Sequence, residues 1–335
     1  MGWFWARNYL QWSVLNSIMI REAGGQARSK KMLPSDFIKV IRPAHGRVAG
    51  DGVKLAFGYW PGRAAPVVAL HGLTASHMNF IGIAERLAGR CALFGLDLRG
   101  RGDSDKPEGP YGLVQHARDV AAAMRALGLG SSIIVGHSMG AFVATALVAQ
   151  EPSLVSGLVL IDGGYVPDTP ITNSPGQGIN AALALRITQL RQTYPSRQNY
   201  REFWRTQPHF PPHEWNPWVE AFLNYEVGGD SPVQPKASET GVRADLGEAF
   251  NRNAVNERLK SIAVPTLWLR AESGFTPGQP PLFPDALVPE FRTYVPHIED
   301  HKFVGTTHYT IALGEYGAAR MADLISELAS RLHSR

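Results

Sequence analysis

Short runs of apolar residues alternate with stretches of helical spacing from residue 44 to the C-terminus. A continuous apolar run of four to eight residues bounded by turn residues is typical of a strand buried on both faces. Such strands, when they alternate with helices, form a parallel sheet covered by helices on each side. The pattern therefore predicts an α/β fold, with strands at 54–60, 67–70, 91–98, 132–138, 155–162 and 264–271 and helices at 78–89, 113–129, 139–150 and 315–332.

Residues 163–263 interrupt this alternation. The stretch is rich in proline and aromatic residues, and it separates the strand that ends at Asp162 from the strand that begins near Val264. An insertion at the carboxyl ends of the strands would cover the edge of the sheet where ligands bind. We therefore predict a mainly helical cap over 163–263, inserted into a core made of residues 41–162 and 264–335. Several of its aromatic residues form the core of the cap, and the others are candidates for ligand contact.

Residues 1–40 form a separate, aromatic-rich segment, and residues 1–20 place apolar side chains at helical spacing. A secretory signal would have a basic start and an uninterrupted apolar stretch, which polar residues break here. The segment is also too polar for a membrane span. Three interpretations stay open: an amphipathic helix that packs on its own domain or on a second subunit, a helix at a membrane surface, or an atypical export signal. The first interpretation predicts a cytoplasmic protein that can form a homodimer through residues 1–20, and the second predicts a membrane-associated one.

The composition excludes several classes of protein. The net charge is +4 and the only basic cluster lies at 28–31, whereas a nucleic-acid-binding protein normally shows a basic stripe. The one cysteine, Cys91, has no partner for an intrachain disulfide, and no spacing of cysteine and histidine residues fits a zinc site. We expect no nucleic-acid partner, no metal and no cofactor.

Ser138 is the strongest candidate for a catalytic residue. It lies in GHSMG (136–140), directly between a buried strand and a helix, so the chain must turn sharply there. The two flanking glycines remove side chains that would clash in such a turn, and the hydroxyl then projects over the edge of the sheet. The N–H of Met139, at the start of the helix, is available to an oxyanion. The pattern predicts a serine nucleophile.

A serine nucleophile needs a base, and His308 is the candidate. It lies in FVGTTHYTI (303–311), on a loop after a short strand and before the last helix. A second oxyanion donor should come from the loop after the strand at 67–70, where Leu73 follows the flexible Gly72. We therefore predict an oxyanion hole formed by the N–H groups of Leu73 and Met139.

These motifs resemble the α/β-hydrolase superfamily, in particular its capped esterases and lipases. The resemblance covers about residues 45–335 and rests on HG at 71–72, DLRGRGDSD at 97–105, GHSMG at 136–140 and the late His308. It implies an α/β-hydrolase fold, with a mostly parallel sheet and a helical cap, and acyl transfer without a cofactor. Dehalogenases and epoxide hydrolases of this fold carry an aspartate at the sharp turn, so Ser138 argues against both.

The acid of the triad departs from the usual family pattern. That pattern is a strand followed by Gly-Glu-x-Asp, and residues 271–274 here read Ala-Glu-Ser-Gly, so a glycine stands in the place of the aspartate. Glu272 lies in this loop, two residues early. Asp162 ends the preceding strand, where some members of the superfamily carry the acid. We favour Asp162 as the residue that orients His308 and keep Glu272 as the alternative.

The expected reaction is hydrolysis of a small-molecule carboxylic ester that carries an apolar, medium-sized group. His308 takes the proton of Ser138, the serine attacks the carbonyl carbon, and water cleaves the acyl-enzyme. A lactonase and a carbon–carbon bond hydrolase would use the same triad, and a ligand-binding protein without turnover is the alternative from another class. Candidates for substrate contact are His71 from the core and, from the aromatic insertion, Tyr165, Trp204, Trp215 and Trp218.

Overall fold

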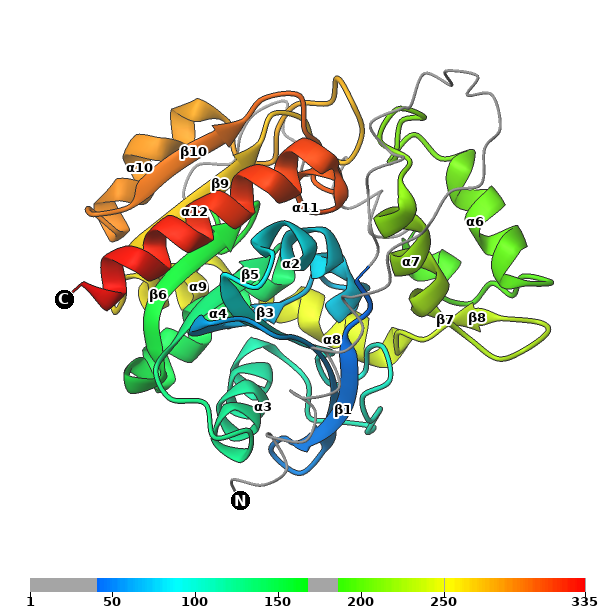
Figure 1. Cartoon of the computed structure of the whole chain (residues 1–335), viewed down its shortest axis with the longest axis horizontal. Helices are drawn as coiled ribbons and strands as arrows, with labels where there is room; N and C mark the ends of the chain where they lie inside the picture. The colour runs from blue at the N-terminus through cyan, green and yellow to red at the C-terminus, as the bar shows by residue number, and fades with distance from the viewer. Residues whose placement is uncertain (1–40, 168–185, 250, 335) are drawn as a thin grey trace, which may run out of the picture. The chain divides into compact units, whose positions relative to one another are not determined.

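The computed structural model describes residues 41–167, 186–249 and 251–334. Its centre is an eight-stranded sheet in the order β1-β2-β4-β3-β5-β6-β9-β10 (Figure 1). β2 runs antiparallel to both of its neighbours, and the remaining pairs are parallel. The predicted α/β architecture, a mostly parallel sheet between helices, is confirmed.

Every predicted strand is present, with bounds that differ by a few residues. The short strand expected before His308 is β10 (Glu299–Phe303). At the other edge, β1 (Ala44–Ala49) has the mixed sequence AHGRVA, which contains no apolar run by which it could be identified. The predicted strands are β2 (Lys54–Trp60), β3 (Ala64–Leu70), β4 (Cys91–Leu96), β5 (Ser132–His137), β6 (Val155–Ile161) and β9 (Thr266–Ala271).

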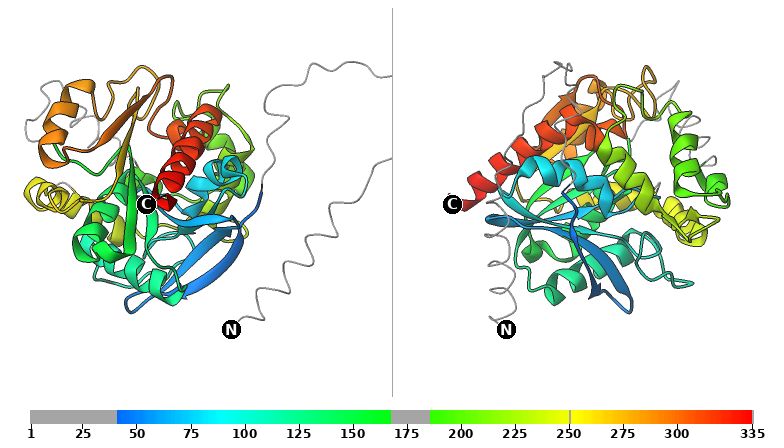
Figure 2. Two further views of the ribbon diagram at one scale, coloured as in Figure 1. Left: turned by 60° about the vertical axis from the view of Figure 1, so that its left-hand side comes forward. Right: turned by 45° about the vertical axis from the view of Figure 1, so that its right-hand side comes forward.

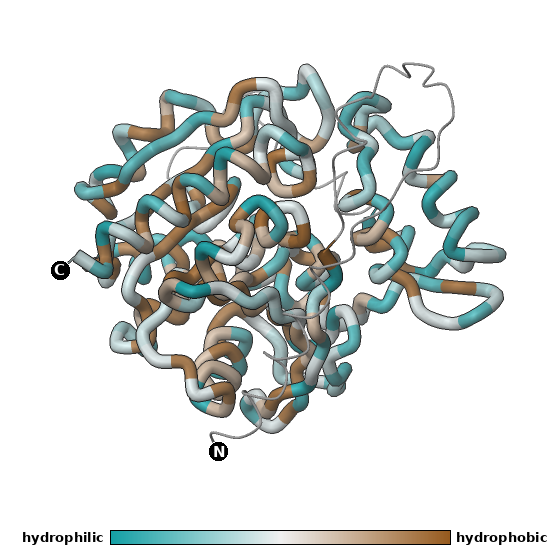
Figure 3. The backbone as a smooth tube through the Cα atoms, viewed as in Figure 1, coloured by the Kyte–Doolittle hydropathy of each residue, from teal (hydrophilic) through white to brown (hydrophobic). Residues whose placement is uncertain are grey.

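Alternate residues of each central strand face two different layers of helices. In β3, Val67 belongs to the apolar cluster that includes α2 and α12, whereas Val68 belongs to the cluster that includes α3 and α4. Because both faces are covered, these strands are apolar at successive positions. Figure 2 shows the helices on the two sides of the sheet, and Figure 3 shows apolar and polar positions alternating along α12. The helices are α2 (Ile81–Leu87), α3 (Leu113–Ala126), α4 (Met139–Gln150), α10 (Val288–Tyr294) and α12 (Glu315–His333).

The described part of the inserted segment is mainly helical. Trp218 packs on α2 at Gly82, where a Cβ atom would lie 2.7 Å from the indole ring. The last helix of the segment, α9, buries Val255 and Leu259 in the same apolar cluster as α4, so it belongs by its packing to the core. The elements are α6 (Arg197–Arg205), α7 (Pro217–Glu226), the pair β7 (Val227–Gly228) and β8 (Gln234–Pro235), α8 (Glu239–Ala249) and α9 (Arg252–Leu259).

The predicted N-terminal helix falls within residues 1–40, outside the described residues. Within the described ranges, no helix combines the length and the apolar character that a membrane crossing requires.

Candidate active site

Ser138 occupies a strained turn between β5 and α4. Its backbone has φ +55° and ψ −120°, a conformation that residues with a side chain rarely adopt. A Cβ atom on Gly136 would lie 2.3 Å from the carbonyl oxygen of Gly140, and one on Gly140 would lie 2.0 Å from that of Leu70. Both flanking positions therefore require glycine. Backbone strain of this kind is common at catalytic residues, where the surrounding structure holds it in place.

His308 and Asp162 form a buried hydrogen bond at the carboxyl end of the sheet. His308 Nδ1 lies 2.6 Å from Asp162 Oδ2, and the Asp162 side chain is fully buried. The second carboxylate oxygen of Asp162 accepts a hydrogen bond from the backbone N–H of Ala271 (3.2 Å). Asp162 follows β6 directly and has a positive φ of 45°. These contacts fix both the carboxylate and the imidazole ring.

Glu272, the alternative acid, points elsewhere. Its Oε2 accepts a hydrogen bond from the backbone N–H of Gly305 (2.8 Å), in the loop before His308. Gly274, which stands where the family pattern has aspartate, accepts the backbone N–H of His308 at 2.9 Å. The loop after β9 thus supports the histidine through its backbone, and Asp162 is the acid that contacts the ring.

His137, the residue before Ser138, was not identified from the sequence as part of the site. Its Nε2 lies 2.9 Å from the carbonyl oxygen of His308, and its Nδ1 lies 3.2 Å from Asn79 Nδ2. Because a carbonyl only accepts, Nε2 carries the proton and Nδ1 accepts from the Asn79 amide. Burial, together with the neighbouring His308, lowers the pKa of His137 well below its usual value. His137 is therefore a neutral residue that supports the loop of His308 through a hydrogen bond to its backbone.

The predicted oxyanion loop after β3 is held by a buried histidine. His71 Nδ1 lies 2.7 Å from the carbonyl oxygen of Gly72, and His71 Nε2 accepts the backbone N–H of Leu98 (3.0 Å). Burial lowers the pKa of His71 to about 4, so the ring is neutral at pH 7. Both ring nitrogens are occupied by the backbone. The prediction that His71 binds substrate does not fit this arrangement, and its contacts give it a role in shaping the loop.

Arg101 connects the two predicted oxyanion residues and was also not identified from the sequence. Its Nε donates to the carbonyl oxygen of Leu73 (2.9 Å), and its Nη2 lies 3.9 Å from Met139 Sδ. The same Nη2 pairs with Asp245 of α8 at 2.5 Å, and both side chains are fully buried. Burial opposes ionisation of Asp245, but the charge of Arg101 and the hydrogen bond from His116 outweigh it and lower the Asp245 pKa.

The aromatic candidates of the inserted segment fall into two groups. Trp218 is fully buried and its Nε1 donates to Glu85 (2.9 Å), and Tyr165 is 1% exposed and stacks on Phe291 of α10. Enclosure by protein leaves neither side chain available to a substrate, which corrects that prediction: they pack the apolar core. Trp215 packs under Arg205 and donates to Glu220.

Trp204 is also buried, but it lies beside residues near the histidine loop. Its ring centroid is 6.4 Å from that of Tyr309 and 5.4 Å from that of His209. Phe275, in the loop after β9, packs edge-on against His308 at 5.0 Å. These aromatic rings give the surroundings of His308 an apolar character.

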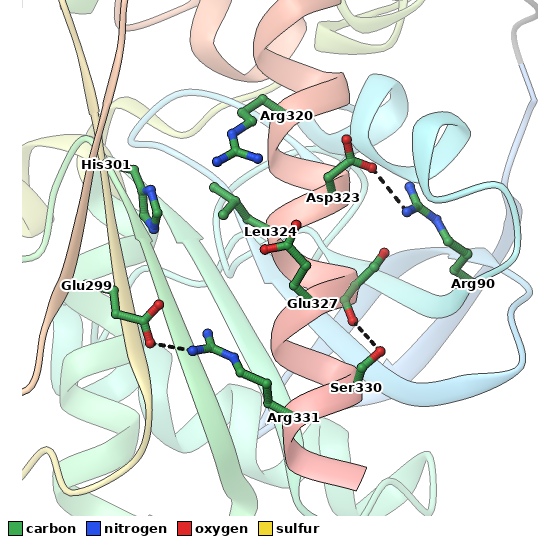
Figure 4. A pocket seen from close by; sticks show the side chains of 10 residues that line it. Arg90, Glu299, His301, Arg320, Asp323, Leu324, Glu327, Ser330 and Arg331 are labelled. Carbon is green, nitrogen blue, oxygen red and sulfur yellow. Dashed lines mark hydrogen bonds and ion pairs between the residues drawn. The ribbon is translucent and has the colours of Figure 1, made fainter. Parts of the chain in front are cut away.

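A separate surface hollow lies between α12 and β10 (Figure 4). Its lining is mostly charged, and it contains two ion pairs: Arg331 with Glu299 at 2.7 Å and Arg90 with Asp323 at 3.1 Å. It contains neither Ser138 nor His308. We therefore place the candidate active site at the carboxyl ends of the strands and not in this hollow.

The chain matches a protein-family model and several known proteins. The family model described as alpha/beta hydrolase fold matches residues 65–314. The chain is 29% identical over 207 residues to a 2-(acetamidomethylene)succinate hydrolase of Mesorhizobium japonicum, an alignment that covers 61% of this chain and 69% of the relative. It is 33% identical over 135 residues to an N-formylmaleamate deformylase of Pseudomonas putida, which covers 40% and 48% of the two proteins.

A third relative is an sn-1-specific diacylglycerol lipase of Mus musculus, 32% identical over 136 residues, with 39% of this chain and 42% of the lipase covered. The chain thus spans less than half the length of the last two relatives. Among solved structures, E-2-(acetamidomethylene)succinate hydrolase superposes with a TM-score of 0.72 at 22% identity, covering 86% of this chain and 99% of that one. The matches support a hydrolase.

Proposed function

Because the chain belongs to the α/β-hydrolase family, we propose that it is a serine hydrolase that cleaves carboxylic esters through an acyl-enzyme on Ser138. The observation that carries the proposal is the buried hydrogen bond between His308 Nδ1 and Asp162 Oδ2 (2.6 Å), on the loop held by the residue before Ser138. A serine, a histidine and a carboxylate in this arrangement are recognised by their geometry and not by their positions in the sequence.

The hydrogen bond to Asp162 determines which nitrogen of His308 acts as the base. Because a carboxylate accepts, Nδ1 carries the proton, and Nε2 is the nitrogen with a free lone pair. Nε2 takes the proton of the Ser138 hydroxyl as the serine attacks the substrate carbonyl carbon. The carboxylate of Asp162 then stabilises the positive charge that forms on the imidazole.

The tetrahedral intermediate needs donors for its oxyanion. Met139 is the first residue of α4, and the N–H groups of a first helical turn have no partner within the helix. The N–H of Leu73 lies on the loop that His71 and Arg101 hold, and a Cβ atom on Gly72 would lie 3.3 Å from Ser138 Cβ, so this loop approaches the serine closely. His308 then protonates the leaving alcohol, and water releases the acid.

A second candidate reaction is the hydrolysis of an amide. It is favoured by the relatives, of which one is named a deformylase and another an acetamidomethylene succinate hydrolase. Hydrolysis of a lactone or of a carbon–carbon bond next to a ketone would use the same three residues. A ligand-binding protein without turnover would keep the fold but would not acylate Ser138.

The test combines covalent labelling with turnover. A fluorophosphonate should add one label per chain at Ser138, located by mass spectrometry of peptides, and Ser138→Ala should abolish the label. Hydrolysis of 4-nitrophenyl esters from acetate to laurate should depend on Ser138 in the same way. Labelling with turnover of an anilide but of no ester would replace the ester proposal by the amide one. Absence of both labelling and turnover would contradict a serine hydrolase.

A further inference from the structure

A buried arginine of the inserted segment reaches the predicted oxyanion loop. Arg186 Nη2 donates to Thr74 Oγ1 at 2.9 Å, and Thr74 directly follows Leu73. Its Nη1 donates to Gln189 (2.9 Å), and the guanidinium lies over the ring of Trp204 at 4.6 Å. The Arg186 side chain is only 13% exposed. Its position is therefore fixed by packing and by two neutral hydrogen bonds.

The positive charge of Arg186 has no hydrogen-bonded anion within the described part of the chain. The nearest carboxylate oxygen is Glu226 Oε1, at 3.9 Å, which is beyond hydrogen-bond distance. Arg186 Nε and Glu226 Oε1 are both buried, and neither has a hydrogen-bond partner among the described residues. Burying a charge is costly unless it is paired and hydrogen-bonded. Within the described residues, Arg186 thus has an ion-pair partner at 3.9 Å but no hydrogen-bonded anion.

The carboxyl group of Glu226 neutralises the charge of Arg186 only in part. Its Oε2 accepts a hydrogen bond from Tyr200 (2.9 Å), which holds the carboxyl group on the side of α6. Burial raises the pKa of Glu226 to about 7, although the charge of Arg186 works in the opposite direction. The group is thus partly protonated at neutral pH. Glu226 therefore balances the charge of Arg186 only in part, and an incoming anion would neutralise the remainder.

A second buried polar group without a hydrogen-bond partner among the described residues, His209 Nδ1, belongs to a ring that packs on the same tryptophan. The ring of His209 packs edge-on against Trp204, and edge-on against Tyr309 at 5.1 Å. His209 Nδ1 is buried and has no hydrogen-bond partner among the described residues. Burial and then the charges of Arg186 and His308 lower its pKa to about 4, so the ring is neutral and has one N–H to donate.

We propose that Arg186 and His209 bind a carboxylate group of the substrate, so that the enzyme acts on acyl compounds that carry an anion close to the bond that is cleaved. The inference rests on the proposed function, which supplies the position of that bond. Arg186 donates to the residue after Leu73, and His209 packs against the residue after His308, so both lie beside loops that carry predicted catalytic groups. A guanidinium binds a carboxylate through parallel hydrogen bonds, and Nε is one of the nitrogens that can form them.

The aromatic rings beside His308 limit the part of the substrate that lies next to the anion. Trp204, Tyr309 and Phe275 form an apolar wall beside His308, which suits a short hydrocarbon segment. Arg186 lies at the Trp204 side of this wall. The expected substrate is therefore a short acyl compound that is apolar in its middle and anionic at one end.

A matched pair of substrates tests this directly. Monomethyl glutarate carries a free carboxylate, and dimethyl glutarate has the same chain without the charge; hydrolysis of each is followed by acid release at constant pH. We expect wild type to cleave the monoester with a kcat/KM at least about tenfold higher, as a hydrogen-bonded charge pair provides. Arg186→Met should lower kcat/KM for the monoester, mainly through KM, and this loss should exceed the loss for the diester about tenfold or more. Equal losses on both substrates, or no preference in wild type, would show that Arg186 only supports the fold.

Binding measured without turnover separates this inference from the proposed function. Calorimetry with glutarate and the Ser138→Ala variant should detect binding that Arg186→Met in the same background weakens at least about tenfold. Glu226→Gln, which keeps a hydrogen-bond partner for Tyr200 and removes the competing charge, should bind glutarate at least as tightly. Absence of glutarate binding in Ser138→Ala, or a tenfold loss in Glu226→Gln, would overturn the anion site. Failure of the proposed function shows instead as loss of phosphonate labelling, with glutarate binding intact.

Discussion

The imidazole of His137 lies against that of His308, with ring centroids 4.7 Å apart, and its Nε2 donates to the His308 carbonyl oxygen at 2.9 Å. His137 precedes Ser138 directly. The end of β5 therefore positions the candidate nucleophile through its backbone and the candidate base through a side chain. A shift of this strand end would therefore displace both groups together.

His137→Leu should lower both stability and activity. The substitution leaves the buried carbonyl oxygen of His308 without a donor, which costs about 1–3 kcal/mol of unfolding free energy. The loosened loop should reduce kcat about tenfold or more, since small misplacements of a base are costly. Urea unfolding and ester hydrolysis measure the two effects. His137→Gln keeps a donor and should lose less of each; an equal loss in both variants would contradict the role of the hydrogen bond.

Asp162→Asn should separate the two candidate acids. An asparagine side chain can present its amide to His308 and favour the wrong tautomer, so we expect kcat to fall about 10⁴-fold with a small change in KM. Glu272→Gln, which keeps an acceptor for the Gly305 N–H, should retain kcat within about threefold. Steady-state kinetics of both variants, with the 4-nitrophenyl ester that wild type hydrolyses fastest, measure these changes in kcat. The reverse ranking of the two variants would assign the acid to Glu272.

Arg101→Met tests the support of the oxyanion loop. The variant removes the donor to the Leu73 carbonyl and should lower kcat by about 10²-fold, the loss seen when one oxyanion donor is misplaced. It also leaves Asp245 buried without its cation, so we expect a loss of about 3–5 kcal/mol in stability.

The matched control for Arg101 is Asp245→Asn, which removes the charge pair but leaves the hydrogen bond between Arg101 and Leu73. It should lose stability and keep most of its kcat. If Asp245→Asn loses as much kcat as Arg101→Met, stability alone explains both variants and the support of the oxyanion loop is refuted.

Ser138→Gly should be more stable than Ser138→Ala, although both are inactive. Only glycine adopts φ +55° and ψ −120° without strain, which costs about 1–3 kcal/mol in other residues. Glycine also loses more entropy on folding, by roughly 0.4–1 kcal/mol. We therefore expect a net gain of about 1 kcal/mol over the alanine variant in urea unfolding. An alanine variant of equal or greater stability would mean that the turn is not strained.

Buried neutral histidines should make the protein less stable below pH 6.5. The pKa of His71 is lowered to about 4 in the folded protein, whereas an unfolded histidine takes up its proton near pH 6.5. Between these values the unfolded chain binds the extra proton. The contribution of His71 to the free energy of unfolding is therefore complete above pH 6.5 and is lost as pH falls toward 4. His71 alone should contribute about 2 kcal/mol of loss between pH 7 and pH 5.

Urea unfolding at the two pH values measures this loss. In His71→Gln, which offers both a donor and an acceptor to the loop, the dependence on pH should be shallower by the contribution of one histidine. Equal stability of wild type at pH 7 and pH 5 would contradict the prediction.

Local patterns in the sequence determined the central part of the fold and the candidate nucleophile. Continuous apolar runs identify β3, β5 and β6 because a strand covered on both faces must be apolar at successive positions. The turn at Ser138 is equally local, since two flanking glycines and a strand followed by a helix permit it and little else does. β1 escaped detection because an edge strand needs no apolar run.

Only the tertiary structure decided which distant side chains meet. Asp162 and Glu272 are both acids after a strand, and no pattern near either residue tells which one faces His308; the placement of β6 beside β5 and β9 brings Asp162 to the ring. In the same way, Trp218 and Trp204 look alike in an aromatic segment, yet one packs on Gly82 and the other lies beside His209. Which residues of an element are buried can be predicted from the sequence, because the apolar pattern of that one element indicates its buried faces. Which distant side chains contact one another depends on the order of the strands in the sheet and on the loops that this order brings together. Local sequence patterns do not contain that information.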